Sequence, residues 1–403
     1  MPGTQTDILV SGAGVAGLAA AAAFGTLGFR VTLVDPAPPV TQENGDGADL
    51  RTTAILQPSV DLLAAAGVWS HLEPHAAPLR VMRIVEAGDA TDAAPRIRDF
   101  IADDIAAETG GRPFGWNLPN WLLRRAMLER LAELPAVTFR SGIATRGVTA
   151  RDSAAIVALS DGSSVHARLL VAADGRDSAV RRALGIGART IRYGQKALAF
   201  AVTHPIPHDN VSTEIHRDGG PFTLVPLPDR EGRPASAVVW MDTGAETLRR
   251  AALPDAAFET EATARSCDLF GPLTLATRRM VWPIIAQVAD SLTAPRTALM
   301  AEAAHVVPPI GAQGLNMSLA DLRCLIDLAA ASPATLGDAA MLDAYARARR
   351  GDIAVRVAGI DLLNRASMAR APALHALRAR TLDMLHALGP VRRTLMRTGL
   401  GLR

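Results

Sequence analysis

The segment from Asp7 to Asp35, DILVSGAGVAGLAAAAAFGTLGFRVTLVD, constrains the fold more than any other part of the chain. Residues 7–10 form a short, mostly apolar run that suits a buried parallel strand. An alanine-rich stretch follows to about Leu27 and has the composition of a helix, and residues 29–34 form a second apolar strand. This order of elements predicts a strand–helix–strand unit at the start of an α/β domain.

Three glycines and one acid give this unit the signature of a binding site. The turn reads Gly12-x-Gly14-x-x-Gly17, in which the first glycine allows a tight turn, the second lets the backbone approach a pyrophosphate and the third permits close helix–strand packing. Asp35 ends the second strand, where a carboxylate accepts hydrogen bonds from ribose hydroxyls. The pattern predicts a dinucleotide site for NAD or FAD with an unphosphorylated ribose.

Composition excludes several other classes of protein. The chain has 403 residues and a net charge of only +2, so it indicates no nucleic-acid partner. Its two cysteines, Cys267 and Cys324, have no metal-like spacing, and prolines interrupt both histidine pairs with i,i+4 spacing. We therefore expect no metal site.

The uncharged stretch from Ile8 to Phe29 is long enough to resemble a membrane span, but its glycines are explained by the binding turn. Asp7 precedes this stretch and no basic segment does, which also disfavours a signal peptide. We expect a cytoplasmic protein, with peripheral contact at the inner membrane surface as an option.

Two later segments also combine strands, glycines and helix starts. The apolar run Leu169–Ala172 leads directly into Asp174-Gly175, and Ser178 then opens a helix. The stretch Glu302–Asp321 contains Pro308-Pro309 and the run Gly311-Ala312-Gln313-Gly314-Leu315-Asn316, followed by a helical pattern. Prolines stiffen such a loop, glycines let its backbone approach a ligand, and the helix presents unpaired N–H groups. The second segment therefore predicts a cradle for an anion or a cofactor.

These segments resemble two motifs of the flavin-dependent aromatic monooxygenases, the single-component FAD hydroxylases. Asp174-Gly175 resembles the family's Asp-Gly motif. Ala301-Glu302-Ala303-Ala304-His305 and the following loop resemble its third motif, Gly-Asp-Ala-Ala-His followed by Gly-Gln-Gly-x-Asn. Within this family, the sequence of the loop most resembles that of the ubiquinone-biosynthesis hydroxylases. Two departures stand out, since Glu302 replaces the usual Asp and Gly311-Ala312 stands where that subfamily has Ala-Gly.

The resemblance implies roles for individual residues. The loop after Pro309 would point backbone N–H groups at the flavin, Glu302 would bind the ribityl chain, and Arg51 would lie near the flavin. Arg124 would reach the FAD phosphates or the ribityl chain, with a plain surface arginine as the alternative. The predicted cofactor-binding residues are Gly12, Gly14, Gly17, Asp35, Arg51, Arg124, Asp174, Gly175, Glu302, Gly311, Ala312, Gln313, Gly314, Leu315 and Asn316.

Residues 190–285 consist of short β-rich runs separated by turns, which predicts a mostly antiparallel sheet. By resemblance this sheet forms the roof of the substrate site. His216 and Tyr193 are candidates for handling a phenol proton, with an ordinary strand residue as the alternative for His216. Pro309 in the loop completes the candidate catalytic set. The candidate lining residues, each with packing in the core as the alternative, are Phe222, Leu224, Pro226 and Trp240.

The chain reads as helical from about Met341. Before Gly389, one helix face is formed by Leu374, Leu377, Leu382, Leu385 and Leu388, with Arg378 and Arg380 beside it. Arg392, Arg393 and Arg397 follow Gly389. Such a basic amphipathic tail could bind a membrane surface or a partner protein, or dock on its own domain.

The predicted fold class is α/β, a discontinuous Rossmann-type FAD domain with an inserted β-rich substrate domain and a C-terminal helical tail. The predicted FAD domain comprises residues 1–75, 100–189 and 286–345, the β-rich domain residues 76–99 and 190–285, and the tail residues 346–403.

The resemblance implies an NAD(P)H- and O₂-dependent enzyme that uses FAD to hydroxylate an aromatic ring, with a prenylated phenol of ubiquinone biosynthesis as the expected substrate. No second strand–GxGxxG–helix unit is present, so NAD(P)H would bind only transiently. Two alternatives are a flavin-fold scaffold that binds quinone intermediates without hydroxylating them and a flavin reductase-type enzyme. The sequence leaves the oligomeric state open.

Overall fold

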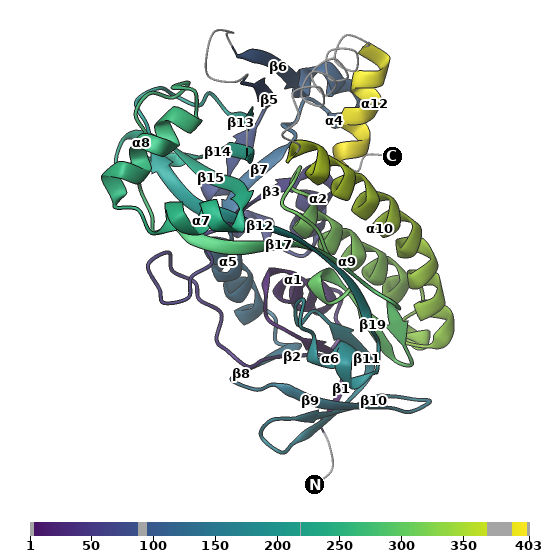
Figure 1. Cartoon of the computed structure of the whole chain (residues 1–403). Coiled ribbons are helices and arrows are strands. Elements are labelled where there is room, and N and C mark those ends of the chain that lie inside the picture. The colour runs from purple at the N-terminus through teal and green to yellow at the C-terminus, as the bar shows by residue number, and fades with distance from the viewer. Residues whose placement is uncertain (1–3, 88–94, 218, 369–388, 401–403) are drawn as a thin grey trace.

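The computed structural model describes residues 4–87, 95–217, 219–368 and 389–400, and it divides its strands mainly between two large sheets (Figure 1). The first sheet has the order β18-β19-β11-β1-β2-β8, and the hairpin β9–β10 pairs with β11. Its central pairs β19–β11, β11–β1, β1–β2 and β2–β8 are all parallel. The strands are β1 (Thr4–Ser11), β2 (Val31–Asp35), β8 (Val137–Ser141), β9 (Thr145–Ala150), β10 (Ala155–Leu159), β11 (Ser164–Ala172), β18 (Thr293–Ala294) and β19 (Thr297–Leu299).

Helix α1 (Val15–Thr26) follows the glycine turn and packs against α5 (Asn120–Ala132) and α9 (Gln313–Ala331). Its central residues from Gly17 to Gly25 are all buried, which explains why the helix is built largely from alanine. Small side chains let a helix approach the sheet and two neighbouring helices at once. Helix α10 (Ala339–Ser367) then packs along α9, and the Asp338 side chain caps its start.

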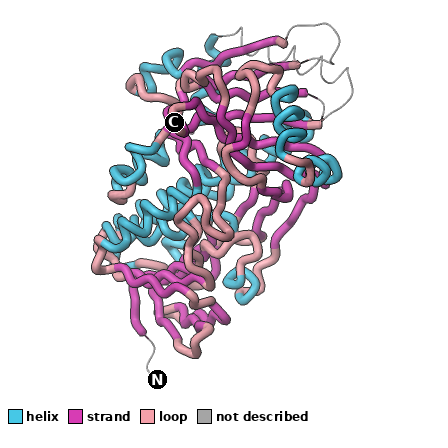
Figure 2. The backbone as a smooth tube through the Cα atoms, turned by 90° about the vertical axis from the view of Figure 1, so that its left-hand side faces the viewer, coloured by secondary structure: helices cyan, strands magenta, loops and turns pink. Residues whose placement is uncertain are grey.

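The second large sheet has the order β20-β17-β12-β15-β14-β13-β5-β6, with β16 paired to β12. All its pairs are antiparallel except β13–β5. Figure 2 shows the strands of the two sheets gathered toward opposite ends of the molecule. The strands are β5 (Val81–Glu86), β6 (Arg96–Ile101), β12 (Ala188–Thr203), β13 (Val211–Arg217), β14 (Gly220–Arg230), β15 (Arg233–Thr243), β16 (Thr274–Leu275), β17 (Met280–Ala289) and β20 (His305–Val306).

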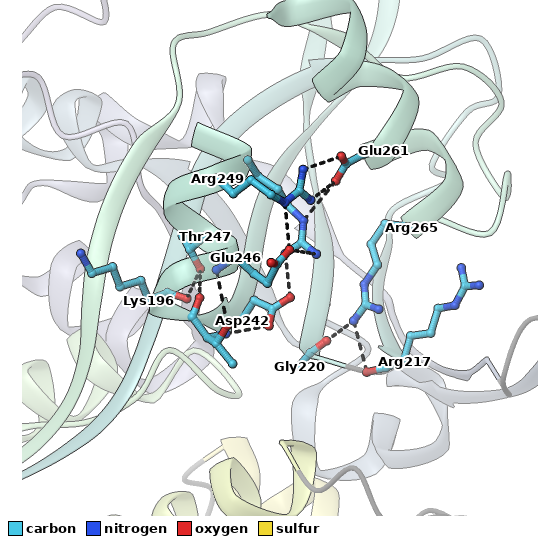
Figure 3. A network of polar contacts seen from close by, with 11 residues as sticks. Lys196, Arg217, Gly220, Asp242, Glu246, Thr247, Arg249, Glu261 and Arg265 are labelled. Carbon is cyan, nitrogen blue, oxygen red and sulfur yellow. Dashed lines mark hydrogen bonds and ion pairs between the residues drawn. The ribbon is translucent and has the colours of Figure 1, made fainter. Parts of the chain in front are cut away.

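One face of this sheet packs under α7 (Gly244–Ala251) and α8 (Asp255–Arg265), with Phe200, Trp240 and Phe258 in the shared core. Charged side chains join the two helices to each other and to the end of β15. Figure 3 shows Arg249 of α7 beside Glu261 of α8, to which it donates at 2.9 and 2.8 Å. Arg250 donates to Glu261 at 3.3 Å and to Asp242 at 2.6 Å. Because Asp242 is nearly fully buried, this ion pair holds α7 on β15.

A small third sheet, β3-β7-β4, lies between these layers. Its strands are β3 (Thr52–Leu56), β4 (Ala77–Leu79) and β7 (Gly115–Pro119). The remaining short helices are α2 (Gln57–Ala65), α3 (Trp69–Leu72), η1 (Glu73–His75), η2 (Ala102–Ile105), α4 (Ala106–Thr109), α6 (Ala179–Ala183), η3 (Ala301–Ala303) and η4 (Pro333–Thr335).

The architecture confirms the predicted α/β fold class. Helices α7 and α8, inside residues 190–285, were not predicted. The division into domains stays a proposal, and its boundary at residues 345 and 346 falls inside the uninterrupted helix α10.

Helix α12 (Gly389–Leu400) is the last described segment of the C-terminal tail, whose first residues belong to α10. Met396 and Leu400 pack in a cluster with Leu56, Ile105 and Phe114. Arg392 pairs with Asp104 at 3.2 Å and Arg397 lies 3.9 Å from Glu108. This helix therefore docks on its own chain. The predicted leucine face, residues 374–388, lies outside the described residues, so its membrane or partner contact stays a prediction. Among the described helices, none has the length and hydropathy to cross a bilayer.

Candidate active site

The glycine turn between β1 and α1 has the predicted strand–turn–helix setting. Gly12 has φ +104°, and a Cβ there would collide with the backbone of Ala173 and Asp174. A Cβ on Gly17 would collide with the Gly12 carbonyl. Around Gly14, in contrast, no atom lies within 4 Å of a built Cβ. Two glycines are thus required by the protein's own packing, while Gly14 borders open space.

Asp35 lies across from this turn at the end of β2. Its Oδ2 accepts a hydrogen bond of 2.6 Å from the Ala13 N–H, and its Oδ1 accepts one of 2.8 Å from the Ala37 N–H. The carboxylate is partly exposed, and each oxygen has further acceptor capacity. It is thereby fixed beside the turn with room to bind hydroxyl groups.

Asp49 is the centre of a buried ionic cluster in front of β3. Arg51 donates to both of its oxygens at 2.8 and 2.7 Å, Asn120 donates at 3.0 Å, and Arg124 lies 3.7 Å away. Burial by itself would raise the pKa of Asp49, but these hydrogen bonds and charges hold it below its ordinary value. The predicted residues Arg51 and Arg124 therefore share one carboxylate that was not itself predicted as a site residue.

Strand β17 of the large antiparallel sheet contacts this cluster. The guanidinium of Arg51 lies 4.0 Å from the centroid of the Trp282 ring, and the Leu50 N–H points at the Met280 sulfur at 3.4 Å. Arg176, next to Gly175, lies over the same ring at 6.0 Å. Trp282 thus bridges the arginine segment and the Asp-Gly segment.

The segment around Glu302 turns sharply after β19. Ala301 has φ +55°, and the buried Asp321 accepts from its N–H at 3.1 Å and from His305 Nε2 at 2.7 Å. Glu302 itself is exposed, and within the described chain its carboxylate has no hydrogen bond. Burial would lower the pKa of Arg51, but Asp49 and, more weakly, Glu302 raise it. Glu302 therefore faces the same cationic group while remaining free to accept from a ligand.

The loop before α9 has two consecutive left-handed residues, Gly311 at φ +62° and Ala312 at φ +55°. Ala312 is the N-cap residue, and no side chain caps the helix. No atom lies within 4 Å of a Cβ built on Gly314. The start of α9 therefore combines uncapped N–H groups with open space, and Leu315 lies in the same first turn.

Two predicted side chains in this loop are already engaged by the protein. Asn316 bonds the edge of β3, donating to Ala54 O at 2.8 Å and accepting from the Leu56 N–H at 3.0 Å. Gln313 donates to Gly311 O at 2.9 Å and accepts from Arg356 at 2.6 Å. Any contact of these two residues with a cofactor would therefore come from the backbone.

The Asp-Gly segment follows β11, as predicted. The Asp174 carboxylate accepts from the Ser178 hydroxyl and, at 3.0 Å, from the Val180 N–H, so it caps the start of α6. Gly175 has φ +82° and open space around a built Cβ. The Asp174 side chain holds the turn in shape, and Gly175 leaves its outer side accessible.

The face of the antiparallel sheet opposite α7 and α8 is called the inner face here; it carries Met280 and Trp282. Four residues of this face lie opposite one another on adjacent strands, in the order Met280, Ala199, Val239 and Thr223. Val239 and Thr223 are partly exposed although they lie on interior strands. Among the described residues, Met280, Val239 and Thr223 are therefore only partly covered, whereas Ala199 is buried. The strip of these four residues carries no charge and begins beside the Asp49 cluster.

The predicted lining residues lie on the other face. Phe222, Leu224 and Trp240 are almost fully buried in the core under α8, and Pro226 shares their side of β14. Strand alternation explains the difference, because a one-residue shift exchanges the two faces of a strand.

The predicted catalytic residues do not meet in one place. His216 lies on the inner-face side of β13, with Nε2 2.8 Å from Glu214 and a buried Nδ1 that has no partner. Tyr193 donates to Asp361 on α10 at 2.6 Å, and burial together with this bond raises its phenol pKa. Pro309 is exposed on the loop before α9. Of the three, only His216 offers an unoccupied proton-binding atom.

These residues fit FAD in several independent respects. Helices α1 and α9 both start without a capping side chain, and Gly14 and Gly314 border open space. The buried Arg124 Nε has no partner among the described residues. Uncapped N–H groups and an unpaired guanidinium nitrogen suit the phosphates and polar edges of a dinucleotide.

Three contributors to this site were missed from the sequence: Asp49, Trp282 and Asp321. Asp49 stands two residues before Arg51, and an acid at that spacing was the available signal. Trp282 and Asp321 meet the site only through tertiary packing, so no local pattern identified them. Within the described ranges, no group of three His, Cys, Asp or Glu side chains is arranged to hold a metal.

Comparison with known proteins places the chain among flavoproteins. Residues 5–358 match the family described as FAD binding domain. The chain is 33% identical to the ubiquinone hydroxylase UbiL of Rhodospirillum rubrum, over 98% of this chain and 89% of the relative. It is 27% identical to the 3-demethoxyubiquinol 3-hydroxylase of Escherichia coli, over the whole of both chains.

Solved structures agree on the fold. The p-nitrophenol 4-monooxygenase PnpA of Pseudomonas putida superposes with a TM-score of 0.79 at 18% identity, covering 99% of each chain. The family match over residues 5–358 and the sequence relatives confirm the resemblance drawn from the motifs. The protein therefore belongs to the FAD binding domain family and is an FAD-dependent aromatic monooxygenase within it.

Proposed function

We propose that the protein hydroxylates the ring of a prenylated phenol in ubiquinone biosynthesis, with NAD(P)H as a transient reductant. Its relatives named as ubiquinone hydroxylases support the pathway. When bound, FAD supplies the oxygen chemistry: once reduced, it activates O₂ and delivers one oxygen atom to the ring, while the other leaves as water.

One observation carries the proposal for the substrate. The strip Met280–Ala199–Val239–Thr223 on the inner face is uncharged, built from small or flexible side chains, and not fully packed over. An electron-rich ring with an apolar chain fits such a surface, because none of these four side chains carries a charge that would need hydration.

The protein's residues would divide the remaining work. The N-termini of α1 and α9, Asp35 and Glu302 would bind the cofactor, and the Asp49–Arg51 cluster would fix the side of the site nearest the sheet. His216 would hold the phenol proton at Nδ1, because Glu214 already occupies Nε2.

The experiment uses the FAD-loaded enzyme and a short-chain prenylated phenol. Substrate should accelerate NAD(P)H oxidation, and Val239→Trp should abolish this acceleration while leaving FAD bound, because the indole fills the strip. Ile191→Trp, at an exposed position on β12, is the matched control and should behave as wild type. Binding of the phenol without any acceleration of flavin reduction would favour a scaffold over a hydroxylase.

A further inference from the structure

A line of alternating charges runs along one side of α10. Arg349 donates to Asp352 at 2.8 Å, and Arg356 donates to the other oxygen of Asp352 at 2.9 Å. The spacings of three and four residues place all three side chains on one helix face. The two ends of this line, Arg349 and Arg356, connect to different loops of the cofactor site.

At the first end, Arg349 donates to the fully buried Asp321 at 2.7 Å. Asp321 in turn holds the Ala301 N–H and the His305 ring. Ala301 has a left-handed backbone, which is unfavourable for a non-glycine residue and persists only where neighbouring contacts stabilise it. The buried Asp321 carboxylate accepts from the Ala301 N–H and so stabilises this backbone conformation in the residue directly before Glu302.

At the second end, Arg356 donates to the Gln313 side-chain oxygen at 2.6 Å. The Gln313 amide donates to Gly311 O at 2.9 Å and to Gly399 O at 3.1 Å. Gly399 lies in the last turn of α12, where backbone carbonyls lack partners within the helix. Gln313 therefore joins its own loop to α10 and to the end of the C-terminal helix.

We propose that Arg349, Asp352 and Arg356 are positioning residues that hold the segments 301–305 and 311–316 in one geometry and couple it to the docking of α12. The guanidinium fork suits this role, since Arg356 bonds an acid and an amide at once through separate nitrogens. The inference rests on the FAD site and not on the identity of the phenol.

The test is Arg356→Met, which keeps the apolar stem and removes both bonds. FAD affinity, measured by titrating the apoprotein, should fall roughly three- to tenfold, as expected for losing a positioning contact of ordinary hydrogen-bond strength. In wild type, FAD should also slow hydrogen exchange of the α12 amides, and the variant should lose this effect. Arg356→Lys should restore it only in part.

Arg365→Met is the matched control. Arg365 lies on the same helix and has the same ion pair with an acid four residues earlier, at 2.9 Å from Asp361, but it does not contact the loop. An Arg356→Met variant with wild-type FAD affinity, or an equal loss in Arg365→Met, would overturn the inference. A wild type that binds no FAD would instead overturn the cofactor assignment itself, and this inference with it.

Discussion

The guanidinium of Arg51 lies over the indole of Trp282, 4.0 Å from the ring centroid, and joins the cofactor-facing segment before β3 to strand β17 of the antiparallel sheet. The same guanidinium holds Asp49 with two hydrogen bonds. One arginine thus fixes the cofactor side of the site to the sheet that carries the open strip. This relationship makes the orientation of Arg51 depend on an aromatic residue 231 positions away in the chain.

Replacing Trp282 should therefore weaken cofactor binding as well as stability. Trp282→Leu removes a cation–π contact worth about 0.5–2 kcal/mol and leaves Arg51 less restrained. We expect a lower melting temperature and a lower FAD affinity, with Trp282→Phe intermediate in both. Thermal denaturation and FAD titration of the same samples measure the two effects. Equal FAD affinity in wild type and Trp282→Leu would show that Arg51 needs no support from β17.

Two buried carboxylates, those of Asp321 and Asp49, should make the free energy of unfolding fall at acidic pH. The pKa of Asp321 is lowered: burial would raise it, but the charges and hydrogen bonds of His305 and Arg349 outweigh burial. The pKa of Asp49 is lowered in the same way by Arg51, Asn120 and Arg124. A lowered folded-state pKa gives stability that is complete above the unfolded value, about 3.9, and is lost as pH falls below it.

Urea unfolding of the apoprotein between pH 3 and pH 7 should therefore show stability falling steeply below about pH 5. Asp321→Asn should flatten this dependence and cost about 3–5 kcal/mol at pH 7, because it removes the fully buried carboxylate that pairs with Arg349 and His305. An unchanged pH dependence in Asp321→Asn would assign the acid sensitivity to other groups.

The glycines of the first turn should separate binding from folding. Gly14→Val places a side chain in open space, so the protein should fold but lose FAD. Gly147→Val is the matched control, since a Cβ on Gly147 also meets nothing within 4 Å, and it should bind FAD normally. Gly12→Ala should instead lower stability, because its φ of +104° and the nearby Ala173 carbonyl exclude a side chain. Normal FAD binding by Gly14→Val would place the pyrophosphate elsewhere.

Glu302 tests the departure from the family pattern. If its exposed carboxylate accepts from the ribityl hydroxyls, Glu302→Ala should weaken FAD binding by roughly 1.5–3 kcal/mol, the range for hydrogen bonds to charged groups. Glu302→Asp should have a mild effect. Isothermal titration of the apoproteins measures the difference, and unchanged affinity in Glu302→Ala would mean that the ribityl contact is absent in this chain.

The two candidate proton-handling residues should behave differently. Tyr193→Phe loses the bond to Asp361 and should cost about 1 kcal/mol of stability with little effect on turnover, because that hydroxyl is already committed. His216→Asn should lower kcat with FAD bound normally. Single-turnover kinetics on both variants tests this assignment. A loss of turnover confined to Tyr193→Phe would reverse it.

The first strand–helix–strand unit was predictable because every signal in it is local. Strand, glycine turn, helix and terminal acid occupy 29 consecutive residues, and β1, α1 and β2 fall within a few residues of their predicted bounds. The loop before α9 was predictable for the same reason, since prolines and glycines act on their own backbone.

The faces of the antiparallel sheet were not predictable in this way. Phe222, Leu224 and Trp240 look like lining residues by type, but which face of a strand meets α8 is decided by register across the sheet. The loop side chains Gln313 and Asn316 show the same limit, because their partners Arg356 and Ala54 are distant in sequence. Side-chain assignment at this site depends on tertiary contacts.

The most direct test of the account follows the oxygen atom. The FAD-loaded protein, NADH or NADPH, ¹⁸O₂ and a prenylated phenol of the ubiquinone pathway are incubated together, and the product is examined by mass spectrometry. We predict a ring-hydroxylated phenol that carries one ¹⁸O atom, with none incorporated from labelled water. Tight binding of that phenol to a fully FAD-loaded protein, with no flavin reduction by either nicotinamide and no labelled product, would contradict the assignment as a hydroxylase.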